Sequence, residues 1–196
     1  MTNQLSIESE PVALRRFSIQ EYHAMADLGL FHPKERLELI NGRIITMSPQ
    51  KPPHASTTSR IGDYLRELVA GIAKICSQLP VRLHDFSEPE PDVAVVRIDR
   101  RDYADRHPVP ADIFLLVEVA DATLDFDLSE KKSDYAHSEI ADYWVVDVKA
   151  EQVYVFRQPV AGRYTEENVL GIDAVLLPLA FPNLEVAISR FFPPVE

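Results

Sequence analysis

The sequence predicts a single α/β domain from three observations: a length of 196 residues, apolar stripes at helical spacing, and several short apolar runs typical of strands. A chain of this length can bury a core without covalent cross-links. Apolar residues make up 46% of the chain and charged residues 26%, which argues against widespread disorder. We expect a flexible tail over residues 1–16 and one domain over residues 17–196.

The N-terminal half of that domain is expected to contain two helices and a hairpin. Ser18, followed three residues later by Glu21, has the pattern of a capping box and predicts the start of a helix. Asn41-Gly42 lies between two apolar-rich runs and predicts a tight β-hairpin. Three prolines then interrupt regular structure, and a helix of about 20 residues is predicted by a stripe at helical spacing. The stripe consists of Ile61, Leu65, Leu68, Val69, Ile72 and Ile75.

The C-terminal half is expected to contain mainly strands. Residues 81–83 form a possible short strand, and the runs DVAVVRI and DIFLLVEVA predict two longer strands in a second hairpin. A short helix is predicted near residues 128–138. It is followed by a strand in YWVVDV, a hairpin partner in QVYVFR, and further β-type segments that end at ISRFF.

Composition limits the classes of function. The chain has 20 Lys and Arg against 31 Asp and Glu, a formal charge of −11 that opposes a broad nucleic-acid-binding surface. Cys76 is the single cysteine, which excludes an intramolecular disulfide and a cysteine-rich zinc cluster. No segment approaches the roughly 20 apolar residues of a membrane span, and the first residues lack the order of a signal peptide. We expect a cytoplasmic protein that does not enter membranes.

Three charged residues interrupt the apolar pattern. Asp92 opens one strand and shares a face with apolar neighbours, so it either caps a turn or serves a site. Glu118 lies inside an apolar strand, where a glutamate is either paired in a salt bridge or bound to a metal. Lys131 lies on the inward stripe of the short helix, where it either extends to the helix edge or pairs with buried acids. The spacing of Glu118 and Lys131 allows one tight turn to bring all three into a shared pocket.

Two further residues are candidates of lower rank. Glu38 lies in the first hairpin, offset from its apolar neighbours, and such glutamates commonly face solvent. His54 precedes the long helix, where an isolated histidine is more often a cap or a surface residue than a ligand.

The chain resembles the Uma-two family of restriction-endonuclease-like proteins over residues 17–192. The resemblance rests on the order and spacing of five motifs and of His54 after a proline-rich bend: RLELINGRI, SEPEPDVAVVR, FLLVEVA, DLSEKKSDYA and DYWVVDV. It implies the fold of the PD-(D/E)XK nucleases, a central mixed sheet flanked by helices, here with additional hairpins. It also implies that Asp92 is the motif aspartate, Glu118 the second acid and Glu38 the upstream acid.

The sequence departs from that pattern at two positions. Ala120 stands where the usual motif lysine lies, and the resemblance implies that Lys131 on the following helix replaces it. Asp121 stands where relatives commonly carry serine. An additional acid there would perturb metal geometry or repel phosphate.

The chemistry of these residues predicts a metal-dependent nuclease. Asp92 and Glu118, with a backbone carbonyl near Val119, are oxygen donors suited to Mg²⁺ or Mn²⁺. Lys131 would then orient water or stabilise charge on the phosphate. His54 would position a phosphate or a site carboxylate, and Glu38 would hold the water shell of the metal or a second ion.

Two other functions remain open. One is a catalytically silent binding or assembly protein that retains the nuclease fold, which the net charge and Asp121 favour. The other is a metal-dependent hydrolase of phosphoesters other than nucleic acid, which would turn over small phosphoesters without cutting DNA or RNA.

The expected partner is nucleic acid, with DNA as the first candidate. Arg97, Arg100, Arg101 and Arg106 are candidate local contacts, although their alternation with aspartates also fits a solvated loop. A homodimer is expected, with DYWVVDV and QVYVFR as a candidate seam.

Overall fold

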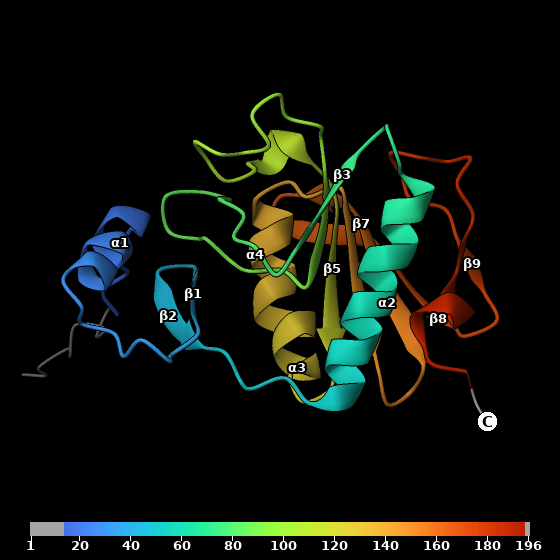
Figure 1. The fold of residues 1–196 in the computed structure, drawn as a ribbon, viewed down its shortest axis with the longest axis horizontal. Helices are drawn as coiled ribbons and strands as arrows, with labels where there is room; N and C mark the ends of the chain where they lie inside the picture. The colour runs from blue at the N-terminus through green and yellow to red at the C-terminus, as the bar shows by residue number, and fades with distance from the viewer. Residues whose placement is uncertain (1–13, 195–196) are drawn as a thin grey trace, which may run out of the picture.

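A mixed six-stranded sheet forms the centre of residues 14–194, the part of the chain that the computed structural model describes (Figure 1). The strand order is β3-β4-β5-β6-β7-β8. The pair β5 and β6 is parallel, and the other neighbouring pairs are antiparallel. The predicted mixed sheet flanked by helices is thus confirmed. The bounds are β3 (Lys74–Ser77), β4 (Val93–Val96), β5 (Ile113–Ala120), β6 (Asp142–Asp147), β7 (Gln152–Val160) and β8 (Arg163–Gly171).

Helices cover both faces of this sheet (Figure 1). Helix α2 (Pro52–Leu68) lies on one face. The other face carries α3 (Leu124–Phe126), a π-helical turn (Asp127–Lys131) and α4 (Lys132–His137), which follow one another directly. Successive strand residues point to opposite faces, and each face therefore has its own apolar core. Ile61 and Leu65 pack on Val117 in the first core, whereas Tyr135 packs with Leu116 in the second.

A small N-terminal lobe lies beside the sheet and consists of α1 (Ile19–Asp27), β1 (Leu37–Ile40) and β2 (Arg43–Thr46) (Figure 1). The predicted capping box is present, because the Ser18 hydroxyl accepts from the Glu21 N–H and Glu21 accepts from the Ser18 N–H. The predicted hairpin is also confirmed. Asn41 and Gly42 have φ of 49° and 77°, which this tight turn requires. Residues 47–51 lead from this lobe to α2.

The C-terminal residues return to the α2 side of the sheet. They form the short pair β9 (Val175–Leu176) and β10 (Val186–Ala187) and end in a 3₁₀ turn, Ile188–Phe191. Leu176, Val186, Ile188 and Phe191 are buried in the same apolar core as α2. The expectation of a β-type segment at ISRFF is therefore wrong at its end, where the chain turns helically. Another 3₁₀ turn, Pro110–Asp112, precedes β5.

The long helix occupies a different range from the one that the apolar stripe predicts. Pro52 and Pro53 begin α2 instead of interrupting structure, since proline is tolerated in the first helical turn. The helix ends at Leu68, and Gly71 then adopts a φ of +78°. Ile75 consequently lies in β3, where it packs against the core on the α2 side while its neighbour Cys76 belongs to the opposite core.

Two shorter elements also differ from expectation. Residues 81–83 are extended but form no named strand, although Val81 and Leu83 donate to Pro89 and Ser87 carbonyls at 2.9 Å and 3.0 Å. The helix predicted near residues 128–138 begins earlier, at Leu124, and contains the π-helical turn. The strands in DVAVVRI, DIFLLVEVA, YWVVDV and QVYVFR are confirmed.

Most of the predicted flexible tail, residues 1–13, lies outside the described residues. The last residue of that tail, Arg16, contacts the domain, because its Nε donates to the Asn41 carbonyl at 3.1 Å.

The candidate dimer seam corresponds to β6 and β7, which are internal strands of the sheet. All residues of β6 are buried within one chain, so β6 cannot supply a seam.

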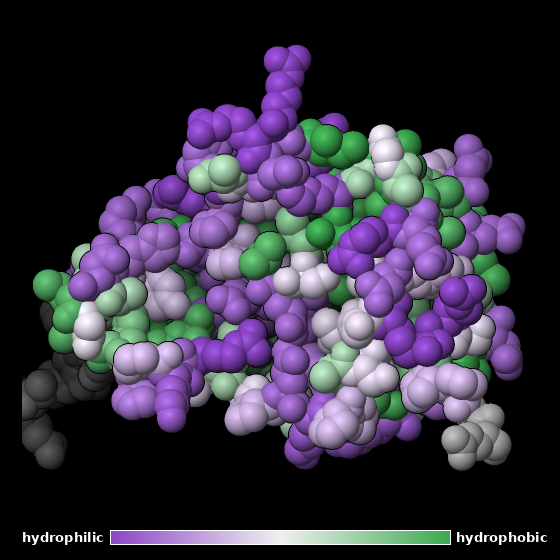
Figure 2. All heavy atoms as spheres, viewed as in Figure 1, coloured by the Kyte–Doolittle hydropathy of each residue, from purple (hydrophilic) through white to green (hydrophobic). Residues whose placement is uncertain are grey.

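Within residues 14–194, none of the helices combines the length and the apolar character needed to cross a bilayer. Hydrophilic residues cover most of the face shown in Figure 2, and apolar residues gather mainly over the N-terminal lobe and the opposite edge.

Asp142 joins β6, β7 and the C-terminal segment. It is fully buried, and its Oδ1 accepts from Trp144 Nε1 at 2.8 Å and from Arg157 Nε at 2.9 Å. Its Oδ2 accepts from the Leu179 N–H at 2.9 Å. Each donor would lose its partner if the carboxylate were removed.

We predict that Asp142→Ala lowers the free energy of unfolding by about 3–5 kcal/mol, because it removes the fully buried acceptor of three donors, one of which is the charged and only partly exposed Arg157 guanidinium. Urea unfolding measures the effect. Asp173→Ala, at an exposed turn residue, is the control and should change stability by less than about 0.5 kcal/mol. Equal stabilities of the two variants would contradict the role given to Asp142.

Candidate active site

Asp92 and Glu118 lie next to each other on the side of the sheet that carries α4. Asp92 directly precedes β4, and Glu118 lies near the end of β5. These strands are antiparallel, with Val93 opposite Val117, so the register continues to place Asp92 opposite Glu118. Asp92 is 8% exposed and Glu118 is 3% exposed. Two acids are thus held close together below the surface.

Lys131 extends from the helical side onto these strands. It ends the π-helical turn and is 4% exposed. Its Nζ lies 3.1 Å from Glu118 Oε1 and 3.3 Å from Glu38 Oε2. Lys131 therefore pairs with buried acids and does not extend to the edge of the helix, the other alternative that the sequence allows.

Glu38 reaches the same place from the N-terminal lobe. It lies in β1, is 4% exposed, and its Oε2 accepts from the Glu90 N–H at 3.2 Å. Of the two interpretations of Glu38, the structure has the one in which it is buried with the other candidate residues and not the one in which it faces solvent. The Lys131 ammonium connects it to the acids of the sheet.

His54 fixes the orientation of Asp92. It lies in the first turn of α2, and its Nε2 is 3.3 Å from Asp92 Oδ2. The same oxygen accepts from the Val119 N–H at 2.8 Å, and Asp92 Oδ1 accepts from Gln78 Nε2 at 3.1 Å. Asp92 therefore has partners on three different elements.

Sequence reasoning missed Asp127 as a member of the site and Tyr135 as a partner of Glu118. Both are buried and lie four residues before and after Lys131, on the same helical face. Tyr135 donates from its hydroxyl to Glu118 Oε1 at 2.6 Å, and Asp127 Oδ2 accepts from the Thr123 hydroxyl at 2.6 Å. Their spacing of four residues from Lys131 is the one sequence signal that points to them, and for Asp127 it is weak because polar residues are common near the start of a helix.

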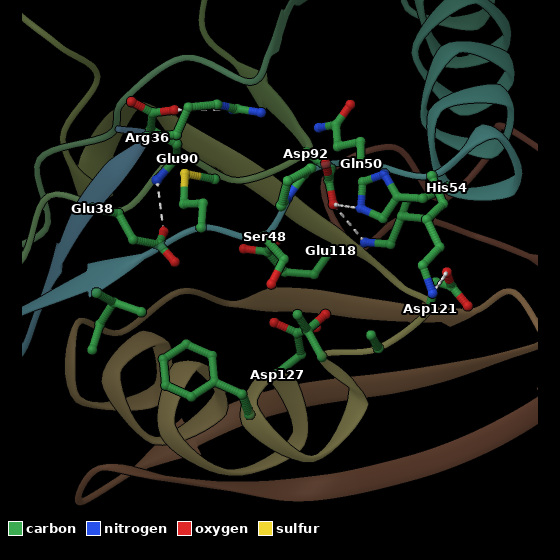
Figure 3. Close-up of a pocket in the computed structure, with 18 of the residues that line it drawn as sticks. Arg36, Glu38, Ser48, Gln50, His54, Glu90, Asp92, Glu118, Asp121 and Asp127 are labelled. Carbon is green, nitrogen blue, oxygen red and sulfur yellow. Dashed lines mark hydrogen bonds and ion pairs between the residues drawn. The ribbon is translucent and has the colours of Figure 1, made fainter. Parts of the chain in front are cut away.

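Six of these residues line one pocket of about 750 Å³ (Figure 3): Glu38, His54, Asp92, Glu118, Asp127 and Lys131. Glu38 and Glu90 lie on one side of it and His54 and Asp121 on the other, with Asp92 and Glu118 between them (Figure 3). Apolar side chains also line the pocket, including Ile45, Met47, Val119 and Phe126. The fold brings all five candidate residues of the sequence together at this pocket: Glu38, His54, Asp92, Glu118 and Lys131.

The candidate arginine contacts do not line this pocket. Arg101 pairs with Asp105 at 2.7 Å, Arg106 pairs with Asp112, and the Arg97 guanidinium lies over the Phe114 ring. The loop that carries them is thus largely self-paired, as the solvated-loop alternative anticipates.

Burial shifts the pKa of two of these acids upward. Burial raises the pKa of Glu118 well above its ordinary value, because the positive charge of Lys131 offsets only part of the lost hydration and three other acids add repulsion. Burial likewise raises the pKa of Asp127 to about 6. Burial alone would lower the pKa of Lys131, but Glu118, Glu38 and Asp127 outweigh it and raise that pKa. Lys131 therefore retains its charge.

The pKa of Asp92 is lowered, unlike those of Glu118 and Asp127, because Asp92 is paired with His54. Burial would raise the pKa of Asp92, but the hydrogen bond and charge of His54, together with the Val119 and Gln78 donors, lower it. Burial would lower the pKa of His54, but Asp92, Asp127 and Asp121 raise it. The carboxylate form of Asp92 is thus favoured, which a metal ligand requires.

The donor set suits a hard divalent cation. In residues 14–194 as placed, no group of three or more His, Cys, Asp or Glu side chains stands ready to hold a metal. Mg²⁺, however, commonly uses one or two carboxylates and keeps several waters. Both hydrogen bonds to Glu118 fall on Oε1, so Oε2 has no partner among the described residues. Asp92 and Glu118 therefore suit such an ion, and Val119 lines the same pocket.

The fold defines the class of protein as restriction-endonuclease-like: acids lie on a mixed central sheet, and Lys131 reaches Glu118 from the helical segment that follows β5. The chain belongs to the Uma2 family, which is described as "Putative restriction endonuclease" and matches residues 19–189. The resemblance inferred from the motifs is thereby confirmed. No curated protein matches the chain.

A solved structure has a similar fold. It is a protein of Anabaena variabilis described as "a putative nuclease belonging to DUF820", with a TM-score of 0.70 and 19% sequence identity. The match covers 90% of this chain and 97% of the other. At this identity, the likeness supports the fold alone.

We predict that Asp127 makes stability depend on pH. Its pKa rises from an ordinary value near 3.8 in the unfolded chain to about 6 in the folded one, so the folded state binds this proton more tightly. The contribution of Asp127 to the free energy of unfolding should therefore be largest below about pH 4 and fall as the pH rises toward about 6. Asp127→Asn should flatten that slope, whereas Asp125→Asn, at an exposed neighbour, should retain it. Urea unfolding across this pH range measures both, and equal slopes would contradict the prediction.

Proposed function

We propose that this protein is a metal-dependent endonuclease that hydrolyses phosphodiester bonds of nucleic acid, with DNA as the expected substrate. One observation carries the proposal: a charged lysine is buried between two carboxylates at the base of an open pocket. Such a group costs stability unless it is compensated, and a scaffold has little use for it. The family of the chain supports the same activity.

Asp92 and Glu118, with the Val119 carbonyl, would hold Mg²⁺ or Mn²⁺. When bound, such an ion lowers the pKa of a water and neutralises charge on a phosphate. Val119 also donates its N–H to Asp92, and Tyr135 donates to Glu118, so both carboxylates are oriented before anything binds. That preorganisation lowers the cost of forming the site.

Lys131 would stabilise the developing negative charge on the phosphate and orient the attacking water. Its raised pKa keeps the ammonium protonated, and its contacts with Glu118 and Glu38 fix its position. Glu38 is therefore proposed as a positioning residue for Lys131. His54 is proposed to hold Asp92 in its charged form, through the contact at 3.3 Å.

A binding or assembly protein of the same fold is the second candidate, because the net charge of −11 opposes phosphate approach. The two functions differ in one measurable respect. The nuclease cuts a strand when metal is present, and the binding protein holds metal or partner without turnover.

We predict that Asp92→Asn weakens Mn²⁺ binding at least ten-fold while the fold persists, because a charged ligand is removed at nearly constant volume. Isothermal titration calorimetry measures the affinity, and circular dichroism checks the fold. Asp63→Asn, at an exposed residue of α2, is the control with the same change in charge. Unchanged affinity in Asp92→Asn would show that Asp92 is not a ligand.

We also predict that Lys131→Met abolishes cleavage while Mn²⁺ remains bound, because the carboxylates capture metal but the lysine acts on the phosphate. Lys132→Met is the matched control: its ammonium pairs with Glu167 on the surface, so cleavage should persist. Lys131→Gln provides a second variant in case the apolar replacement fails to fold.

The assay uses single-stranded, duplex and branched DNA and RNA at low salt, with Mg²⁺ and with Mn²⁺. Loss of cleavage in both Lys131 variants, with Mn²⁺ still bound, is the expected result. If the wild-type protein binds Mn²⁺ at Asp92 and Glu118 but cuts no substrate, the binding-protein alternative replaces the nuclease.

A further inference from the structure

Asp121 lies at the mouth of the pocket between two lysines. Its Oδ1 is 3.4 Å from Lys149 Nζ, which also donates to the Asp121 backbone carbonyl at 2.5 Å. Its Oδ2 is 3.9 Å from Lys51 Nζ. In Figure 3, Asp121 lies on the His54 side of the pocket, away from Glu38 and Glu90. The carboxylate is therefore engaged with cations of the rim and not with Lys131.

The exposure of these three side chains is uneven. The side chains of Lys51 and Lys149 are 70% and 72% exposed, whereas that of Asp121 is 14% exposed. Ion pairs with such exposed partners contribute roughly 0–1 kcal/mol to stability. Stability therefore does not account for two cations gathered at one acid beside the pocket.

The three residues lie where a ligand of this fold would pass. Asp121 follows the last residue of β5, Lys149 lies in the turn between β6 and β7, and Lys51 is the N-cap of α2. Because β5 and β6 are parallel, their carboxyl ends meet at one edge of the sheet, a common position for ligands. The N-terminal end of a helix of 17 residues adds partial positive charge there.

A phosphate oxygen and a carboxylate oxygen compete for the same ammonium groups. Both accept hydrogen bonds from lysine, and both carry negative charge. In the free protein the carboxylate is tethered next to the lysines, so its effective concentration is high. A phosphate that binds Lys51 and Lys149 must therefore displace Asp121 and also overcome its repulsion.

We propose that Lys51 and Lys149 form a binding subsite for a backbone phosphate beside the scissile one, and that Asp121 is an internal competitor that occupies this subsite. The inference rests on the proposed nuclease function and adds a control of substrate affinity. It also gives Asp121 a role at the rim: it restrains substrate binding through the lysines without contacting Lys131.

The test measures binding without cleavage. Fluorescence anisotropy with a labelled DNA single strand and the matching duplex, in Ca²⁺ at low salt, compares Asp121→Asn with wild type. We expect about five- to ten-fold tighter binding, equivalent to roughly 1 kcal/mol, because two ammonium groups are released for phosphate. The gain should shrink as salt is raised. Asp121→Ser serves as a second variant, and melting temperatures verify that each protein is folded.

Two controls distinguish the release of Lys51 and Lys149 from a general effect of the change in net charge on DNA binding. Asp63→Asn removes the same charge from a surface pair with Arg66, 2.7 Å away on α2, and should change affinity less than two-fold. Lys51→Met and Lys149→Met together should eliminate the gain in the Asp121→Asn background. The single strand and the duplex indicate which form the subsite accepts.

The outcomes are distinct from those of the nuclease assay. Three results would overturn the inference. The first is that Asp121→Asn changes DNA affinity no more than Asp63→Asn does, and the second is that its gain in affinity persists when both lysines are replaced. The third is that no variant binds either the single strand or the duplex. Tighter binding that depends on both lysines supports the subsite even if no cleavage occurs, in which case only the nuclease proposal fails.

Discussion

The buried ammonium of Lys131 is the interaction on which the candidate site depends. Glu118, Glu38 and Asp127 all lie near it with little exposure, and each would repel the others if it stood alone. Removal of a charge from water costs several kcal/mol, which only close opposite charge and hydrogen bonds offset. The lysine thus permits a group of acids to remain below the surface. The pKa of Lys131 and the pKa of Glu118 are both raised, because each depends on burial and on the charges of the neighbouring groups.

The backbone places these groups with little freedom. An antiparallel pair of strands sets Asp92 beside Glu118, and the helical segment after β5 brings Lys131 to Glu118. The π-helical turn lies between Asp127 and Lys131, at the point where the segment carries its buried charges. Such turns widen a helix locally and are frequent at functional sites. Side-chain contacts from Tyr135, His54 and Gln78 then fix the orientation of the carboxylates.

The sequence predicts part of this arrangement because three residues break a regular apolar period. Asp92, Glu118 and Lys131 could be found in this way, and family resemblance added Glu38. Asp127 could not be selected with the same force, since polar residues are common near the start of a helix. The tertiary approach of His54 to Asp92 also has no local signal. The end of α2 was misjudged because an apolar stripe continued past Gly71 into β3, where a strand period replaced the helical one.

The order of the site residues along the chain has a consequence for folding. Glu38, Asp92, Glu118 and Asp127 all precede Lys131, so a chain emerging from the ribosome exposes every acid before its cation. Until the lysine arrives, hydration is the most favourable state for these carboxylates. Burial of Glu38 against Lys131 also joins the N-terminal lobe to the helical segment after β5, two parts of the chain that are far apart in sequence. The charges of the site can thus be balanced only after Lys131 has been synthesised.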